Sequence, residues 1–126
     1  MIAVDTSALI AILLGEAGGA RCAQVLADEE AVLISAGTLA EAMIVADRRN
    51  IGPELRRLVE DLAFEVAPVT PAAASRVAEC YARWGRGIHA AGLNFGDCFA
   101  YALASERDAP LLYVGEDFKA TDLTPA

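Results

Sequence analysis

Short apolar runs recur along the chain, separated by longer stretches with helical spacing of apolar residues. Each run is only four to six residues long and holds few polar positions, which is typical of strands buried on both faces. The predicted strands are Met1–Val4, Ala31–Ile34, Phe64–Val69 and Leu111–Val114. The tail from Ala120 is a candidate for a last edge strand.

The stretches between these runs predict helices, and capping residues mark where several of them begin. Asp5-Thr6-Ser7 and Thr70-Pro71 are of this kind. Glycines make Gly85–Gly96 the one long irregular segment, and Gly115–Lys119 is expected to be a turn or short helix. The predicted helices are Ala8–Leu14, Ala20–Ala27, a helix from the Ser35–Thr38 caps to about Arg49, Glu54–Phe64, Pro71–Trp84 and Gly96–Arg107.

Strands that alternate with helices predict an α/β fold, with a central parallel sheet flanked by helices on both faces. The 126 residues suit one domain spanning 1–126, and no repeat or linker interrupts them. In such sheets, ligands bind outside the carboxyl ends of the strands. Polar residues that follow strands are therefore the first candidates for a functional site.

Composition narrows the function classes. At 56% hydrophobic residues the chain is not a disordered segment, and its net charge of −8 argues against a nucleic-acid partner unless carboxylates bind cations. The three cysteines form no CxxC pair, which predicts reduced thiols rather than zinc or disulfides. No apolar run reaches membrane-spanning length, and Asp5 is the only charge before Ala8–Leu14. We therefore expect a soluble cytoplasmic protein that makes no membrane contact.

Four acidic residues are expected at the carboxyl edge of the sheet. Asp5 directly follows the first strand, and Glu41 lies one turn into the helix after the second. Asp97 opens the helix that leads into the last strand, and Asp117 follows that strand. Carboxylates gathered at one edge repel each other unless cations neutralise them, and oxygen ligands suit Mg²⁺ or Mn²⁺. A metal-dependent hydrolase that acts on phosphodiesters fits this chemistry.

Each acid also has a structural interpretation that the sequence leaves open. Asp5 can cap the first helix, Asp97 can interact with a helix dipole, and Asp117 can cap a turn. Glu41 is the hardest to explain structurally, because it is the only charged residue between Ala31 and Ala46. A lone acid in an apolar helix is usually paired, protonated or bound to metal.

Four motifs resemble those of PIN-domain ribonucleases and, more narrowly, VapC toxins of type II toxin–antitoxin modules. They are VDTSAL at 4–9, LAEA at 39–42, LNFGDCFAYALA at 93–104 and GEDF at 115–118. The resemblance spans almost the whole chain, with the motifs in matching order and spacing. It implies a PIN-like fold and endonucleolytic, Mg²⁺- or Mn²⁺-dependent cleavage of RNA. It also implies a homodimer and a cognate antitoxin that covers the acidic site.

The same resemblance assigns roles to individual residues. Asp5 and Asp97 match the core metal ligands, while Glu41 and Asp117 complete the metal shell and orient the attacking water. Thr6 matches a hydroxyl that hydrogen-bonds the site. Asp122 in the TDL segment is a weaker, fifth acidic candidate.

Cationic residues near the glycine-rich loop are candidates for RNA contact. Arg83, Arg86 and His89 surround Trp84, and cations beside a stackable ring suit single-stranded RNA. Lys119 is close in sequence to Asp117 and could contact phosphate. The alternative is a solvated loop with Trp84 packed in the core.

Two other functions are compatible with a small acidic α/β domain. A phospho-acceptor signalling domain would place an acid pair after the first strand and an aspartate after the third. Here Asp5 has no acidic neighbour, and Phe64–Val69 is followed by Thr70-Pro71. A protein that only binds and sequesters a partner would not need all four acids.

Overall fold

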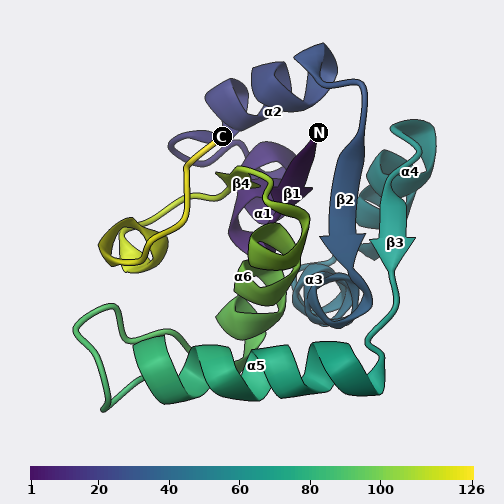
Figure 1. The fold of residues 1–126 in the computed structure, drawn as a ribbon. Coiled ribbons are helices and arrows are strands. Elements are labelled where there is room, and N and C mark those ends of the chain that lie inside the picture. Colours follow the sequence, from purple (N-terminus) through teal and green to yellow (C-terminus); the bar gives the residue numbers. More distant parts are fainter.

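The central sheet contains four parallel strands in the order β3-β2-β1-β4. A computed structural model describes all 126 residues and confirms the predicted α/β class (Figure 1). The strands are β1 (Ile2–Val4), β2 (Val32–Ser35), β3 (Glu65–Ala67) and β4 (Leu111–Leu112).

The last two strands are shorter than predicted. β3 is an edge strand, and only Ala67 of its three residues is buried. β4 ends early because the Val114 N–H donates to the Ser7 side chain instead of to a neighbouring strand. The expected edge strand in the tail is reduced to one isolated bridge between Leu111 and Pro125.

All the predicted helices are present; Pro71–Trp84 has the predicted bounds, and the others have at least one shifted end. α1 begins directly after its cap at Asp5, and α3 directly after its cap at Ser35, so both start earlier than predicted. α4 ends before Phe64 because Ala63 adopts a left-handed conformation with φ of 50°. The helices are α1 (Thr6–Leu14), α2 (Gly19–Asp28), α3 (Ala36–Arg48), α4 (Gly52–Asp61), α5 (Pro71–Trp84), α6 (Phe95–Arg107) and the 3₁₀ helix η1 (Asp117–Ala120).

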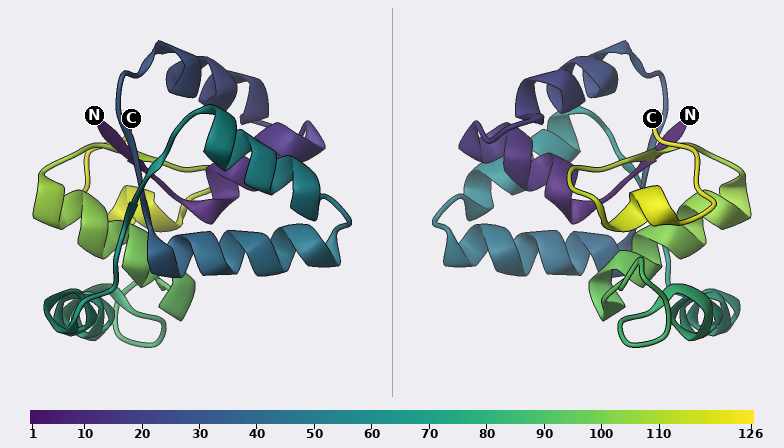
Figure 2. Two further views of the ribbon diagram at one scale, coloured as in Figure 1. Left: turned by 90° about the vertical axis from the view of Figure 1, so that its right-hand side faces the viewer. Right: turned by 90° about the vertical axis from the view of Figure 1, so that its left-hand side faces the viewer.

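Two hydrophobic cores lie on opposite faces of the sheet, because successive strand side chains point to opposite sides. Ala3, Leu33 and Leu111 belong to the core formed with α5 and α6. Ile2 and Val4 belong to the core formed with α1, α2, α3 and α4. The two groups of helices lie on opposite sides of the sheet in Figure 2.

The order of the strands reverses around β1. The chain builds β1, β2 and β3 outward in one direction, then returns through α5 and α6 to place β4 on the other side of β1. A reversal of this kind creates a crevice at the carboxyl ends of the two central strands. Asp5 lies there, immediately after β1. No single helix is both long and apolar enough to cross a membrane; α1 and α2 meet that test only jointly, across a bend of 112°.

Candidate active site

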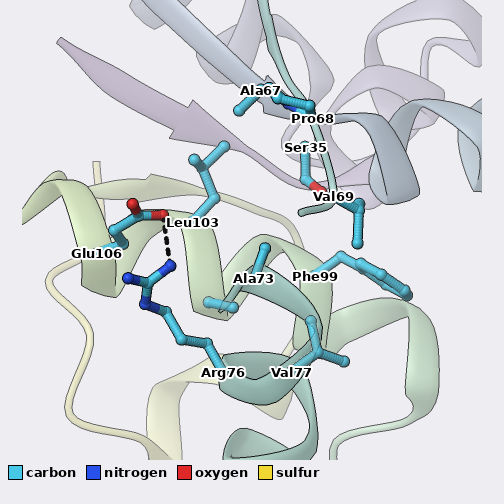
Figure 3. Close-up of a pocket in the computed structure, with 11 residues that line it drawn as sticks. Ser35, Ala67, Pro68, Val69, Ala73, Arg76, Val77, Phe99, Leu103 and Glu106 are labelled. Carbon is cyan, nitrogen blue, oxygen red and sulfur yellow. Dashed lines mark ion pairs between the residues drawn. The ribbon is translucent and has the colours of Figure 1, made fainter. Parts of the chain in front are cut away.

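The best-enclosed cavity is not the functional site. It has a volume of about 30 Å³ and lies between the end of β3, α5 and α6, bordered by the Arg76–Glu106 ion pair (Figure 3). Ligand pockets are typically about 300 Å³ or larger, so this space suits a water molecule or two at most. The chemistry is concentrated instead at the carboxyl end of β1.

Asp5 is a buried helix cap with one unused oxygen. Its Oδ2 accepts the Ser7 N–H at 3.0 Å and the Ser7 hydroxyl at 2.7 Å. Its Oδ1 is buried and has no hydrogen-bond partner, although the residue is only 3% exposed. Burial, with a smaller contribution from the charges of Asp97 and Glu41, raises the pKa of Asp5 to about 6, although the hydrogen bonds from Ser7 lower it. The capping role is confirmed, and it leaves half of the carboxylate free.

Glu41 is held by the hydroxyl of Thr6. Thr6 Oγ1 lies 2.7 Å from Glu41 Oε1 and 3.3 Å from the Thr38 carbonyl oxygen, so the carboxylate is the nearer acceptor. The other side of the carboxylate lies against the backbone of Gly96, where a Cβ would collide with it. Glycine at position 96 therefore lets α6 approach α3 closely enough to bring Glu41 beside Asp97.

Asp97 lies in the first turn of α6, in a capping box. Asn94 Oδ1 accepts the Asp97 N–H at 2.8 Å, and Asp97 Oδ2 accepts the Asn94 N–H at 3.0 Å. Burial raises the pKa of Asp97, as do the charges of Asp117 and Glu41, while Arg86 opposes them. The helix-terminus interpretation of Asp97 is thus confirmed, and the residue still belongs to the acidic group.

The structure brings three of the four predicted acids together and places the fourth at their margin. The charges of Asp97 and Glu41 raise the pKa of Asp5, and the charge of Glu41 raises the pKa of Asp97. Asp117 lies at the start of η1 and is exposed, and its negative charge raises the pKa of Asp97. We call these four side chains the acidic site.

The oxygen atoms of the acidic site are the ligand type that a hard divalent cation prefers. The side chains are not arranged around a common point at which they could coordinate such an ion. No group of three or more His, Cys, Asp or Glu side chains is arranged to hold an ion. The unpartnered Oδ1 of Asp5, the all-oxygen donor set and the uncompensated charge all fit Mg²⁺ or Mn²⁺. Asp5, whose Oδ1 is unpartnered, and Asp97 are the residues that could hold such a cation, with Glu41 beside them.

Three of the four residues predicted to contact RNA, Arg83, Lys119 and His89, already interact with other groups of the protein. Arg83 lies 3.5 Å from Asp122 and stacks over the Trp84 ring. Lys119 pairs with Glu116 at 3.0 Å. The remaining cation, Arg86, is exposed and close enough to Asp97 to lower its pKa.

Trp84 is packed in the core, as the alternative to RNA contact in the sequence interpretation expected. Trp84 is buried and donates its indole N–H to the Tyr101 hydroxyl at 3.0 Å. His89 packs against the Trp84 ring, and its Nδ1 accepts the Ala91 N–H at 2.9 Å. Asp122 accepts the Tyr101 hydroxyl at 2.6 Å, so this fifth acid belongs to the tyrosine network.

Sequence reasoning missed Ser7 and Gly96. The Ser7 hydroxyl donates to Asp5 and accepts the Val114 N–H at 3.0 Å, which links the acidic site to the segment that leads to Asp117. The position of Ser7, two residues after a capping aspartate, was an available signal for the first of these bonds. Nothing local to Gly96 reveals that Glu41 lies against it.

Comparisons with known proteins agree with this architecture. The family model described as PIN domain matches residues 2–123. Ribonuclease VapC28 of Mycobacterium tuberculosis is 45% identical, with 98% of this chain and 96% of that protein covered. Ribonuclease VapC36 of the same species is 42% identical, with 95% of this chain and 89% of that protein covered.

Solved structures show the same fold at low sequence identity. Mycobacterium tuberculosis VapC20, described as a sarcin–ricin loop cleaving toxin, superposes with a TM-score of 0.80 at 20% identity, covering 100% of this chain and 98% of that one. A toxin–antitoxin complex from Klebsiella pneumoniae gives a TM-score of 0.74 at 19% identity, covering 97% and 93%. At these identities the likeness establishes the fold alone.

Proposed function

Because the chain belongs to the PIN-domain family, among proteins named VapC ribonucleases, we propose that it is a metal-dependent endoribonuclease and the toxin of a toxin–antitoxin module. The observation that carries the proposal is the buried Asp5 carboxylate, whose Oδ1 has no partner and which lies beside two further acids. A fold that needed only a helix cap would not bury an unsatisfied carboxylate oxygen among other negative charges.

The division of labour follows from the hydrogen bonds. Asp5 and Asp97 each use Oδ2 for capping, which fixes their orientation and leaves Oδ1 available for a cation. Thr6 fixes one oxygen of Glu41, and the carboxylate would help to orient the attacking water by accepting a hydrogen bond from it. A divalent cation, when bound, would lower the pKa of such a water and stabilise charge on the phosphodiester.

The exposed residues of the site have supporting roles in this proposal. Asp117 completes the cluster from its outer side. Arg86 would contact an RNA phosphate beside Asp97, and Lys119 and Arg83 would do so only by exchanging their present carboxylate partners. His89 would act through the shape of the loop, since its Nδ1 is already an acceptor.

The proposed protein partners are a cognate antitoxin and a second copy of this chain. The structural neighbour from Klebsiella pneumoniae is a toxin–antitoxin complex, which supports the first of these. The acidic site attracts cationic groups, so a basic antitoxin side chain would suit it.

The proposal is tested by RNA cleavage with purified, antitoxin-free protein. Structured and unstructured RNAs are incubated with Mg²⁺, Mn²⁺ or EDTA, using wild type, Asp97→Asn and the control Glu106→Gln. Glu106 is an exposed acid of α6 that is paired with Arg76. We expect wild type and the control to cleave RNA equally, EDTA to stop cleavage, and Asp97→Asn to lower the rate by about a thousandfold, since metal-centred stabilisation contributes several kcal/mol.

Two results would contradict the proposal. Cleavage that persists in EDTA, or is unchanged in Asp97→Asn, would refute the metal mechanism. No cleavage of any RNA, together with no binding of Mn²⁺ by calorimetry, would indicate a protein that only binds a partner.

A further inference from the structure

Phe95 is an exposed aromatic residue directly beside the acidic site. It is the first residue of α6 and is 69% exposed, more than any other large hydrophobic residue of the chain. Its ring meets that of Phe99 edge to face, with the centroids 4.9 Å apart. This contact holds the ring from the side of the protein, so its outer surface faces solvent in a defined orientation.

The ring forms one wall of a groove between α3 and α6. Ile44, which is 60% exposed, lies across this groove on α3, and the groove also includes Glu41 and Gly96. Gly37 belongs to the same groove, and a Cβ there would collide with the Phe99 ring. Glu41 lines this groove and is also a member of the acidic site, so the groove and the acidic site adjoin at Glu41.

We propose that this groove binds an unpaired nucleobase of the RNA substrate, stacked on Phe95 next to the phosphate at the acidic site. The inference rests on the proposed ribonuclease function. A chain with a net charge of −8 cannot rely on the phosphate contacts that usually dominate RNA affinity. Stacking on an aromatic ring is a source of affinity that needs no positive charge.

A nucleobase suits the groove better than an apolar protein surface does. An apolar surface packed on Phe95 and Ile44 would also cover Glu41 and bury its carboxylate without a counter-charge, which is costly. A nucleobase combines a flat apolar face with N–H groups on its edge, and such groups can donate to a carboxylate. The groove offers a ring and a carboxylate side by side.

The test measures binding separately from cleavage. Single-stranded RNA oligonucleotides containing 2-aminopurine are titrated with Asp97→Asn protein, which cleaves them slowly, and the fluorescence is quenched when the base stacks. The variants added to this background are Phe95→Leu, which keeps an apolar side chain without a ring, and Phe95→Trp, which keeps a ring. Leu62→Ala is the control, since Leu62 is exposed at the end of α4.

We expect Phe95→Leu to weaken RNA binding by about tenfold and to abolish the quenching, as the loss of one stacked base would. Phe95→Trp and the control should bind as the parent does. Equal binding and quenching with Phe95→Leu would overturn the inference. So would a change of sedimentation coefficient in Phe95→Leu without RNA, which would assign the groove to a second copy of the chain. Failure of the unmutated protein to cleave any RNA is a separate result, and it would refute the proposed function on which the inference rests.

Discussion

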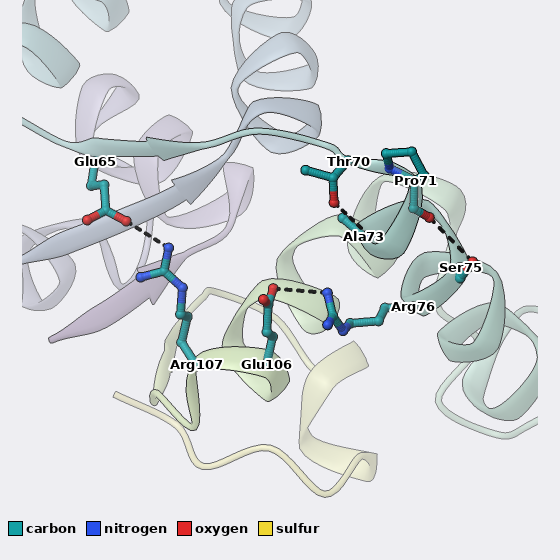
Figure 4. A network of polar contacts seen from close by, with 8 residues as sticks. All are labelled: Glu65, Thr70, Pro71, Ala73, Ser75, Arg76, Glu106 and Arg107. Atoms are coloured by element: carbon teal, nitrogen blue, oxygen red, sulfur yellow. Dashed lines mark hydrogen bonds and ion pairs between the residues drawn. The ribbon is translucent and has the colours of Figure 1, made fainter.

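Two regions of this protein treat their acidic residues in opposite ways. On β3 and α6, two exposed carboxylates are paired with arginines: Glu65 with Arg107 at 2.9 Å and Glu106 with Arg76 at 3.4 Å (Figure 4). At the carboxyl end of β1, Asp5 and Asp97 are buried, and neither has an arginine or lysine within ion-pair distance.

The difference distinguishes carboxylates whose charge slightly stabilises the folded state from carboxylates whose charge destabilises it. Exposed ion pairs contribute at most about 1 kcal/mol each, so the paired flank can lose one with little effect. A buried carboxylate without a counter-charge lowers stability, as the raised pKa values of Asp5 and Asp97 indicate. Buried carboxylates without a counter-charge, gathered at one place, are typical of a functional site.

A divalent cation should compensate the charge of the acidic site and so stabilise the folded protein. At about 100 times its dissociation constant, a ligand that binds only the folded state adds about 2.7 kcal/mol. For a chain of this size we expect Mn²⁺ to raise the melting temperature by roughly 10 °C, measured by differential scanning calorimetry. Asp97→Asn should lose this increase, and Glu106→Gln, from the paired flank, should keep it. An equal increase in both variants would place the cation elsewhere.

Neutralising a buried acid should stabilise the metal-free protein. The pKa of Asp5 is about 6 in the fold and 3.8 in its absence, so the folded state binds more protons between these values. The stability that Asp5 contributes is therefore present below about pH 4 and is lost as the pH rises through 6. At pH 7 we expect Asp5→Asn to raise the free energy of unfolding by about 1–3 kcal/mol, measured by urea denaturation in EDTA.

The matched comparison uses an acid of the other region. Glu65→Gln removes one partner of an exposed pair and should lower stability by less than about 1 kcal/mol, the opposite sign. At pH 4 the Asp5→Asn variant should match wild type, because Asp5 is then protonated. A variant that is destabilised at pH 7 would show that the Asp5 carboxylate supports the fold, and the contrast between the regions would fail.

The fold was largely predictable because its signals are local. Buried strands show as short apolar runs, and capping residues such as Asp5 and Thr70 mark helix starts. The errors fall where tertiary contacts decide. Val114 continues an apolar run, yet its N–H is bound by Ser7, which is far away in the sequence. For Trp84, at the end of α5, the sequence left an RNA-contact role and a place in the core both open; its indole N–H donates to the Tyr101 hydroxyl and its ring is buried.

The sequence indicated which acidic residues gather at the carboxyl edge of the sheet. It did not indicate their hydrogen bonds or the residues packed against them. The setting of Glu41 in an apolar helix indicated a special role, and the structure gives it a partner in Thr6. The sequence could not show that Asp5 retains an unpartnered oxygen, or that Glu41 lies against Gly96. Both depend on how closely α1, α3 and α6 approach one another.

Ser7 gives the smallest expected difference between the two regions, because a serine in each region donates its hydroxyl to a residue close in sequence: Ser7 to Asp5, and Ser75 to Pro71. Ser7→Ala removes the hydroxyl bond to Asp5 and leaves the Val114 N–H without its acceptor, so we expect a loss of about 1–2 kcal/mol in urea denaturation at pH 7. Ser75 Oγ bonds only to the Pro71 carbonyl on the exposed side of α5 (Figure 4), and Ser75→Ala should change stability by less than about 0.5 kcal/mol. Because the hydrogen bond from the Ser7 hydroxyl lowers the pKa of Asp5, its loss should also shift the pH-dependent decline in stability to higher pH, while the backbone bond from residue 7 remains. If both alanine variants behave alike, Ser7 does not connect Asp5 to the segment that carries Asp117, and the acidic site is held by its helix caps alone.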